Sequence, residues 1–190
     1  MNVYDFDGTI YDGDATVGFV LYTLRRHPLA MLRSLPGQAS AVVSYLAGKT
    51  DKTRMKSRFF SFLQYLDDVE GDVKNYWDKN RHKIKVWYLA QQKEDDVIIS
   101  ASAEFLLSDI CARLGIRHLI ATRMDPRTGE ISGANCKGKE KPGRFYEIFP
   151  EGEIDGFYSD HDSDRYMAAL AKRSYLVKKN DLSKWPENMR

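Results

Sequence analysis

The stretch Val3-Tyr4-Asp5-Phe6-Asp7-Gly8-Thr9, near the start of the chain, decides the fold. Val3 to Phe6 reads as a short strand that ends in an Asp-Gly turn. Residues two apart in a strand point the same way, so Asp5 and Asp7 can both face one ligand at the strand's end. Two carboxylates this close repel each other, and a cation bound between them would stabilise both ionised forms. Mg²⁺ suits such a pair because it prefers hard oxygen ligands. Taken alone, the stretch is also typical of an Asp-rich turn before a helix.

Residues 15–92 have the texture of a helical region, with apolar residues three and four positions apart. We expect Pro28, Pro36-Gly37 and Gly48 to break it into separate helices. No comparable helical block occurs elsewhere in the chain, so it is predicted to be an insertion.

From residue 96 onward, strands and helices alternate. Val97-Ile98-Ile99 is a buried-strand run, and Ser102 is a plausible N-cap for a helix that stops at Gly115. Later segments predict strands at 118–122, 154–158 and 175–178, a small hairpin around Ile131 and a helix at 164–172.

This alternation predicts an α/β fold: a Rossmann-like, doubly wound parallel sheet with helices on both faces. The first strand lies far from its partners in sequence, so the helical insertion must sit above the sheet's carboxyl edge. We expect residues 1–14 and 93–190 to form the α/β core and residues 15–92 to form a helical cap domain.

Further polar residues follow two of the later strands. Ser100 comes directly after the run at 97–99, where its hydroxyl and nearby N–H groups can hold a phosphate oxygen. Asp160 follows the strand at 154–158, and Asp164 lies four residues further on. The two can supply a metal carboxylate and a supporting one. The simpler alternative for Asp160 and Asp164 is a negatively charged helix start, stabilised by the helix dipole.

Three lysines, Lys137, Lys139 and Lys141, lie in the segment Cys-Lys-Gly-Lys-Glu-Lys-Pro. A fixed ammonium group here could neutralise a nucleophile and a transferring phosphoryl group. A solvated basic loop is the alternative for any one of them.

Taken in order, an Asp pair, a Ser, a Lys and a second Asp pair resemble the four motifs of the haloacid dehalogenase superfamily. The likeness is closer to its phosphoserine-phosphatase-like branch, whose helical cap lies where residues 15–92 lie here. Ser100 to Leu106 resembles that branch's second motif, although Ala103 stands where proline is usual. For the third motif, Lys141 fits a subgroup with Gly-x-x-Lys and Lys137 fits true phosphoserine phosphatases; we favour Lys141.

The resemblance implies a role for each matching residue. Asp5 would be the nucleophile and a magnesium ligand, while Asp7 would be the acid/base and would also ligate magnesium through its backbone carbonyl. Asp160 would be the third protein ligand of Mg²⁺. The remaining implied site residues are the catalytic Lys141, the supporting Asp164, and Thr9, Asp14, Ser100 and Ala101 around the substrate.

The function predicted is that of a Mg²⁺-dependent phosphatase that hydrolyses phosphomonoesters through an aspartyl-phosphate intermediate. A phosphotransferase or phosphomutase on the same scaffold is one alternative. A non-catalytic protein that binds a phospho-ligand is another, and the four intact motifs argue against it. A phospho-accepting receiver module also has a parallel sheet, an Asp cluster and a lysine, but the insertion after the first strand argues against it.

Charge is distributed unevenly along the chain. Residues 15–60 carry a net +7 and the remainder −5, which together give +2. The substrate expected is a small or lipid-like phosphomonoester, and basic residues beside apolar helix faces could also contact an anionic membrane. The alternative is a cap with its own small core and a solvated basic rim, which would attract a phosphate-bearing substrate as well. No nucleic-acid-binding motif is present, so no nucleic acid is expected.

The two cysteines, Cys111 and Cys136, do not form a disulfide framework or a metal-binding pattern. Neither a leader segment nor a run of about 20 apolar residues is visible. A reducing, cytoplasmic setting is therefore expected. The oligomeric state is not predictable from these features.

Overall fold

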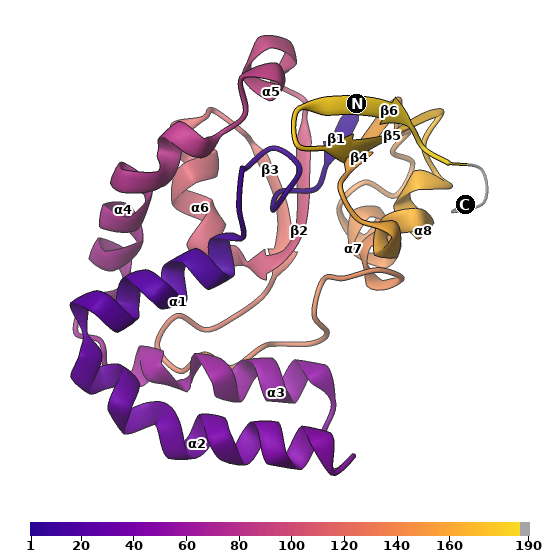
Figure 1. The fold of residues 1–190 in the computed structure, drawn as a ribbon. Coiled ribbons are helices and arrows are strands. Elements are labelled where there is room, and N and C mark those ends of the chain that lie inside the picture. Colours follow the sequence, from indigo (N-terminus) through magenta and orange to yellow (C-terminus); the bar gives the residue numbers. More distant parts are fainter. Residues whose placement is uncertain (187–190) are drawn as a thin grey trace.

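The computed structural model describes residues 1–186 and consists of a six-stranded sheet, helices on both its faces and a helical region below it (Figure 1). The sheet order is β3-β2-β1-β4-β5-β6, and every pairing is parallel except that of β5 with β6. The strands are β1 (Asn2–Tyr4), β2 (Val97–Ala103), β3 (His118–Thr122), β4 (Gly156–Ser159), β5 (Arg173–Lys178) and β6 (Asp181–Lys184). The predicted α/β fold is confirmed.

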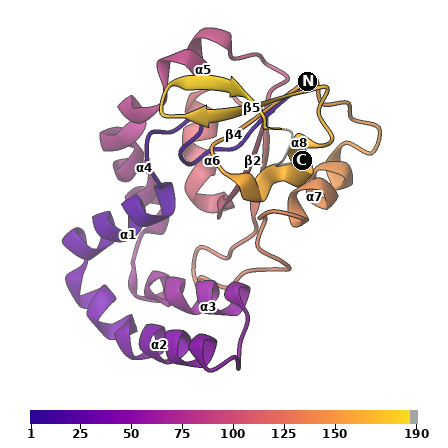
Figure 2. The ribbon, with the colours of Figure 1, turned by 45° about the vertical axis from the view of Figure 1, so that its right-hand side comes forward.

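Alternate residues of the central strands supply two separate cores. Tyr4 of β1 and Ile98 of β2 belong to one apolar cluster, whereas Val3 and Val97 belong to the other. Successive side chains of a strand point to opposite faces, so both faces of this sheet are buried. Figure 2 shows α4 (Val69–Asn80) and α6 (Glu104–Arg113) on one side of the sheet, and α7 (Glu140–Ile148) and α8 (Arg165–Ala168) on the other.

The chain between β1 and β2 is almost wholly helical. It contains α1 (Ala15–Arg26), α2 (Pro28–Leu46), α3 (Lys52–Phe59), η1 (Phe60–Tyr65), α4, η2 (Arg81–Lys83) and α5 (Val86–Gln91). α2 and α3 lie side by side below the sheet (Figures 1 and 2). The division into a core and a cap domain at residues 15–92 remains a prediction. Within the described residues, no helix combines the length and apolarity needed to cross a membrane.

A loop from the core holds the lower helices in place. Between β3 and α7, the backbone N–H of Ile131 donates to the Ser57 hydroxyl of α3 at 3.0 Å. At Gly129 (φ +77°), a Cβ atom would lie 2.5 Å from the carbonyl oxygen of Phe60, so only glycine allows this close approach.

Some sequence predictions of the elements are wrong. Pro36-Gly37 does not end a helix, because α2 continues through both residues. Pro36 has no N–H to donate to the Leu32 carbonyl. Leu32 and Pro36 both lie on the exposed side of the helix, where water can donate to that carbonyl instead. Pro28 does begin a helix, and α2 ends before Gly48 as expected.

Ser102 is not an N-cap. β2 extends to Ala103, α6 begins at Glu104, and the Ser102 side chain turns to a carboxylate instead. The predicted helix at 164–172 is shorter, with α8 ending at Ala168 after η3 (Asp162–Asp164). α7 and β6 were not predicted. Pro142 lies in the first turn of α7, where a missing N–H costs little.

Candidate active site

A polar cavity of about 290 Å³ lies where β1, β2 and β4 end. Parallel strands bring their carboxyl ends to one edge of a sheet, which is where open α/β folds bind ligands. Its lining is Asp5, Asp7, Asp14, Thr16, Lys56, Ser100, Ala101, Ser102, Lys137, Lys141, Asp160, His161, Ser163 and Asp164. The cavity thus collects all the residues predicted for the site except Thr9, which is buried beneath it.

Lys141 joins two of the carboxylates. From the first turn of α7, its Nζ donates to Asp5 Oδ1 at 2.7 Å and to Asp164 Oδ2 at 2.5 Å. The Ser159 hydroxyl also donates to Asp164 Oδ2, at 2.9 Å. Lys141 is 1% exposed, so this ammonium group is fixed by its partners and shielded from water. Lys137 also lines the cavity, but its side chain is exposed, whereas Lys141 is buried against Asp5. The catalytic role of Lys141 remains a prediction.

Negative charge is in excess around Lys141. Burial raises the pKa of Asp5 to about 7, with Lys141 opposing the rise and the charges of Asp164 and Asp7 adding to it. For Lys141, burial alone would lower the pKa, but Asp5 and Asp164 outweigh it and raise the pKa above its ordinary value. One lysine therefore does not balance the carboxylates, and a further cation would favour their ionised forms.

Two hydrogen bonds fix the Asp7 side chain. The Ser102 hydroxyl donates to Oδ2 at 2.5 Å, and the backbone N–H of Ala15 donates to Oδ1 at 2.6 Å. The hydroxyls of Thr16 and Ser102 lie 3.0 Å apart, which extends this network. Burial raises the pKa of Asp7 to about 6, against the lowering effect of both hydrogen bonds. A carboxylate poised near neutrality is suited to general acid–base catalysis.

Gly8 and Thr9 bring the first motif against Asp160. Gly8 has φ +70°, and a Cβ atom there would lie 2.1 Å from Asp160 Oδ2. The backbone N–H of Asp160 donates to the Thr9 hydroxyl at 2.9 Å. The same hydroxyl lies 3.4 Å from Asp5 Oδ2 and 3.5 Å from Asp160 Oδ1, so it sits between the two carboxylates.

The donor set of this cavity fits Mg²⁺. Asp5 and Asp160 present carboxylate oxygens to one small space, and burial raises the pKa of Asp160 as it does that of Asp5. Across residues 1–186 there is no group of three or more His, Cys, Asp or Glu side chains arranged as a metal cage. Mg²⁺ does not require one, since it is usually held by one or two carboxylates together with waters and phosphate.

The end of β2 forms a tight polar turn. The Ser100 hydroxyl accepts from the backbone N–H of Ser102 at 3.0 Å and is almost fully buried. Asp14 lines the same cavity and caps α1 by accepting from the N–H of Val17 at 2.8 Å. The substrate contacts predicted for Ser100, Ala101 and Asp14 remain predictions.

Lys56 of α3 lines the cavity although the sequence does not predict it as a site residue. Its Nζ donates to the carbonyl of Ala101 at 2.7 Å and to Asn135 Oδ1 at 3.1 Å. Burial lowers the pKa of Lys56 to about 8, although the charges of Asp7 and Asp14 oppose the shift. In the sequence, it is one of several basic residues in a helical segment, and no local signal separates it from its neighbours. The hydrogen bond from Ser102 to Asp7 was also not predicted, because a serine after a strand is equally typical of a helix N-cap.

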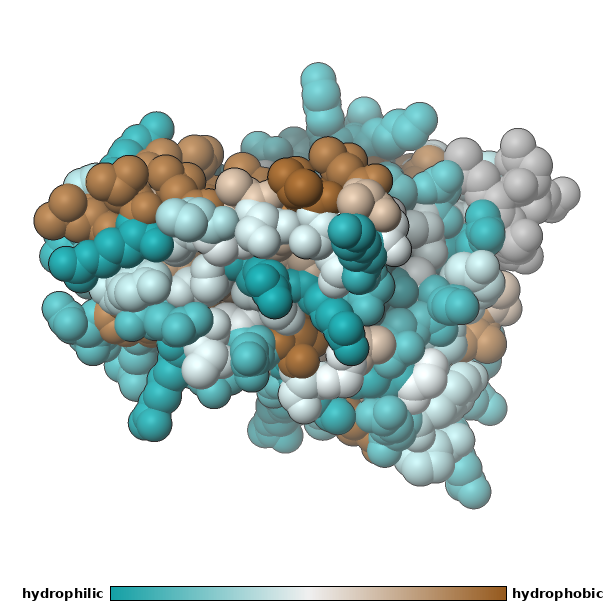
Figure 3. All heavy atoms as spheres, turned by 90° about the horizontal axis from the view of Figure 1, so that it is seen from below, coloured by the Kyte–Doolittle hydropathy of each residue, from teal (hydrophilic) through white to brown (hydrophobic). Residues whose placement is uncertain are grey.

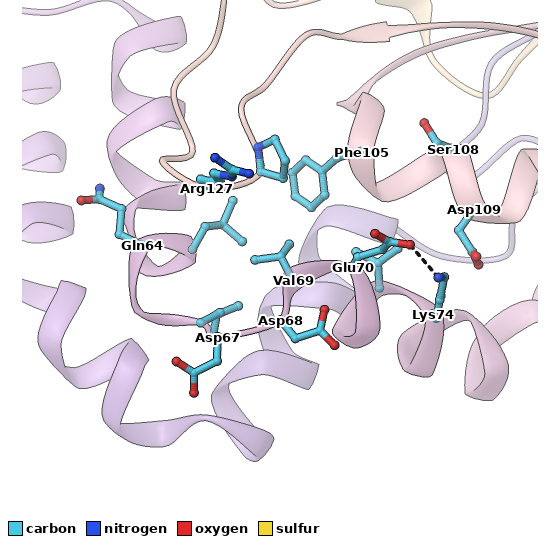
Figure 4. Close-up of a pocket in the computed structure, with 14 residues that line it drawn as sticks. Gln64, Asp67, Asp68, Val69, Glu70, Lys74, Phe105, Ser108, Asp109 and Arg127 are labelled. Atoms are coloured by element: carbon cyan, nitrogen blue, oxygen red, sulfur yellow. Dashed lines mark hydrogen bonds and ion pairs between the residues drawn. The ribbon is translucent and has the colours of Figure 1, made fainter.

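A larger cavity lies elsewhere. It measures about 820 Å³ and is formed mainly by η1, α4 and α6, with Phe105, Val69 and Glu70 among its walls (Figure 4). None of the predicted catalytic residues lines it. The smaller cavity at the strand ends therefore remains the candidate active site.

Comparison with known proteins decides the family. Residues 3–169 match the family model described as haloacid dehalogenase-like hydrolase. The chain belongs to this family. The match confirms the superfamily that the order of the four motifs predicts.

Individual relatives of this haloacid dehalogenase-like hydrolase are distant. Protein CicA of Caulobacter vibrioides is 28% identical over 92% of this chain and 84% of its own length. A Bordetella pertussis protein of unknown function has a similar structure, with a TM-score of 0.72, 19% identity, and coverage of 92% of this chain and 87% of that one. A phosphoserine phosphohydrolase-like protein of Francisella tularensis matches with a TM-score of 0.57, 13% identity, and coverage of 92% and 86%. At these identities, the structural matches show the shared fold.

Proposed function

We propose that this haloacid dehalogenase-like hydrolase is a Mg²⁺-dependent phosphatase that cleaves phosphomonoesters through a phosphorylated Asp5. The observation that carries the proposal is the position of Asp5. It lies at the end of β1, paired with buried Lys141, in one cavity with Asp7 and Asp160.

In the first step, the Asp5 carboxylate attacks phosphorus, a P–O bond forms to Asp5, and the bond to the substrate's alcohol oxygen breaks. Asp7 gives that oxygen its proton, so the product leaves as a neutral alcohol. Lys141 stabilises negative charge at Asp5 and on the transferring group throughout. Mg²⁺, held by Asp5, the Asp7 carbonyl and Asp160, would supply positive charge to the phosphoryl oxygens.

In the second step, Asp7 takes a proton from water, which attacks the phosphorus of the aspartyl-phosphate. The bond to Asp5 breaks, free phosphate leaves, and both aspartates return to their starting states. The hydrogen bonds from Ser102 and Ala15 keep Asp7 in one orientation for both proton transfers.

The proposed substrate is a small or lipid-like phosphomonoester. Lys56 reaches the catalytic cavity from the helical region, so the phosphate-bearing end of a substrate meets a cation from that side as well. Both cysteines are free and buried. This fits the proposed cytoplasmic location.

The test is phosphate release from a panel of phosphomonoesters that includes an aryl phosphate, phosphoserine and lipid phosphates. Release that requires Mg²⁺ and disappears in Asp5→Asn supports the proposal. Transfer of the phosphoryl group to an added alcohol or sugar in preference to water would assign the site to a phosphotransferase. No turnover of any compound would remove the hydrolase assignment.

A further inference from the structure

Helix α2 exposes most of its large apolar side chains. The face that packs against the protein buries Ala30, Met31 and Ala41 together with the polar Ser34 and Gln38. Their polar groups bond internally, with Gln38 Nε2 donating to the Phe59 carbonyl at 3.0 Å. The exposed face carries Leu29, Leu32, Leu35, Val42, Val43 and Leu46, here called the α2 face.

The side chains of the α2 face recur three, four or seven residues apart, so they form one stripe along the helix. Leu29 is 68% exposed and Leu46 is 79% exposed. Figure 3, which views the molecule from below, shows brown side chains gathered along one flank of this surface beside teal ones. Soluble proteins rarely expose a contiguous apolar stripe of this kind without a partner.

The ionised side chains that α1 and α2 themselves carry are all basic, although Arg26 pairs with Asp72 of α4 at 3.7 Å. From Ala15 to Thr50 the chain contains no Asp or Glu, whereas Arg25, Arg26, Arg33 and Lys49 are present and exposed. An apolar helix face bordered by cations is typical of helices that lie in the headgroup region of an anionic bilayer.

We propose that the α2 face docks on an anionic lipid bilayer, with its leucine and valine side chains inserted and its basic residues among the headgroups. A second copy of the chain is the less favourable partner, because a two-fold contact between α2 faces would bring the basic residues of the two copies, with no Asp or Glu on either helix, to one interface. This surface goes beyond the proposed hydrolysis, since binding to a membrane requires no turnover.

The α2 face lies one helix away from the catalytic cavity. α2 packs on α3 and η1, and α3 carries Lys56 to the Ala101 carbonyl in the cavity wall. A protein held on a membrane by α2 would therefore work close to the lipid surface.

The experiment is co-sedimentation of the full chain with vesicles. One set contains phosphatidylglycerol and phosphatidylcholine in equal amounts, and the other contains phosphatidylcholine alone. We expect binding to the anionic set that weakens as salt is added, and little binding to the neutral set. The double variant Leu32→Gln/Val43→Gln should bind about tenfold more weakly. Arg33→Gln should bind about fivefold more weakly.

The matched control for the apolar variant is Val86→Gln/Leu182→Gln, which changes two exposed apolar residues on α5 and β6, far from α2 in Figure 1. Lys93→Gln, an exposed lysine before β2, is the control for charge. Both controls should bind as the wild type does, and thermal unfolding should confirm that all four variants fold.

No binding to anionic vesicles, or equal binding by Leu32→Gln/Val43→Gln, would overturn the proposal. A dimer in solution that the same double variant dissociates, without vesicle binding, would also overturn it and give the α2 face to a second copy. Each of these results leaves the phosphate-release assay unaffected, so the two proposals can fail separately.

Discussion

The ammonium nitrogen of Lys141 lies 2.7 Å from Oδ1 of Asp5, and the two side chains are only 2% and 12% exposed. The pair couples the first motif of the chain to the start of α7, 136 residues later. Its chemistry depends on both members, because each would be an isolated charge in a buried site without the other.

Replacing Lys141 should damage both stability and activity. Lys141→Met leaves Asp5 and Asp164 without their shared cation, and we expect a loss of about 3 kcal/mol in the free energy of unfolding. Phosphate release should fall to background. Lys139→Met, at an exposed position in the same segment, should change stability by less than about 0.5 kcal/mol.

Urea unfolding and phosphate release measure these two effects. Lys141→Met leaves the buried carboxylates of Asp5 and Asp164 without a cation. The double variant Lys141→Met/Asp5→Asn removes one of these charges and should therefore be more stable than Lys141→Met. A single variant that unfolds like the wild type would contradict the buried ion pair.

Gly8→Ala should inactivate the protein through Asp160. Its Cβ atom would lie 2.1 Å from Asp160 Oδ2, so that carboxylate must move. We expect about a 100-fold loss in kcat/KM and a higher Mg²⁺ concentration for half-maximal activity. Gly115→Ala is the control, because Gly115 has φ +71° and nothing within 4 Å of the added atom.

Both variants should lose about 1–2 kcal/mol of stability from backbone strain. Equal loss of activity in the two would show that strain, and not the displacement of Asp160, is responsible.

Ser102→Ala should slow the chemical step. The variant removes the 2.5 Å hydrogen bond to Asp7, so the proposed acid/base loses its fixed orientation and its pKa rises further above about 6. We expect kcat to fall about tenfold, with a smaller change in KM. The exposed Ser108 hydroxyl donates to the Glu104 carbonyl, away from the catalytic cavity, so Ser108→Ala should have no effect on steady-state kinetics. If both serine variants behave alike, Ser102 has no role in positioning Asp7.

Lys56 should make substrate affinity depend on pH. Its pKa is lowered to about 8, so it is cationic below that pH and neutral above it. The KM for an anionic substrate should therefore rise as the pH passes upward through about 8. Lys56→Gln should raise KM about tenfold at pH 7 and remove this rise.

Arg54→Gln, on the same helix but with its side chain 80% exposed, is the control and should keep the wild-type profile. A wild-type KM that stays flat between pH 7 and 9 would place Lys56 outside the substrate's reach.

The sequence carried enough information for the fold because the signals were local. Strand runs at Val97 and His118 and a polar residue after each central strand determine a parallel sheet and its functional edge. α2 continues through Pro36 because this proline lies on the exposed side of the helix, where water can bond the carbonyl that loses its partner. α7 was not predicted because a proline usually breaks a helix, whereas Pro142 lies in the first turn, where proline is tolerated.

The site was predictable where it is built from motifs and obscure where it depends on tertiary contacts. Asp5, Asp7, Ser100, Lys141 and Asp160 were predicted, and the structure places them around one cavity. The contributions of Lys56 and Ser102 depend on which helix folds over the cavity and which way a hydroxyl turns. Neither is a local property of the sequence.

Covalent labelling of Asp5 tests the central proposal most directly. The protein would be mixed with Mg²⁺ and an aryl phosphate carrying labelled phosphorus, quenched in acid within the first turnover, and digested for peptide mapping. We expect label on the N-terminal peptide, at Asp5, and none in Asp5→Asn or in the presence of a chelator. Phosphate release that continues in Asp5→Asn, or label on a different residue, would contradict it.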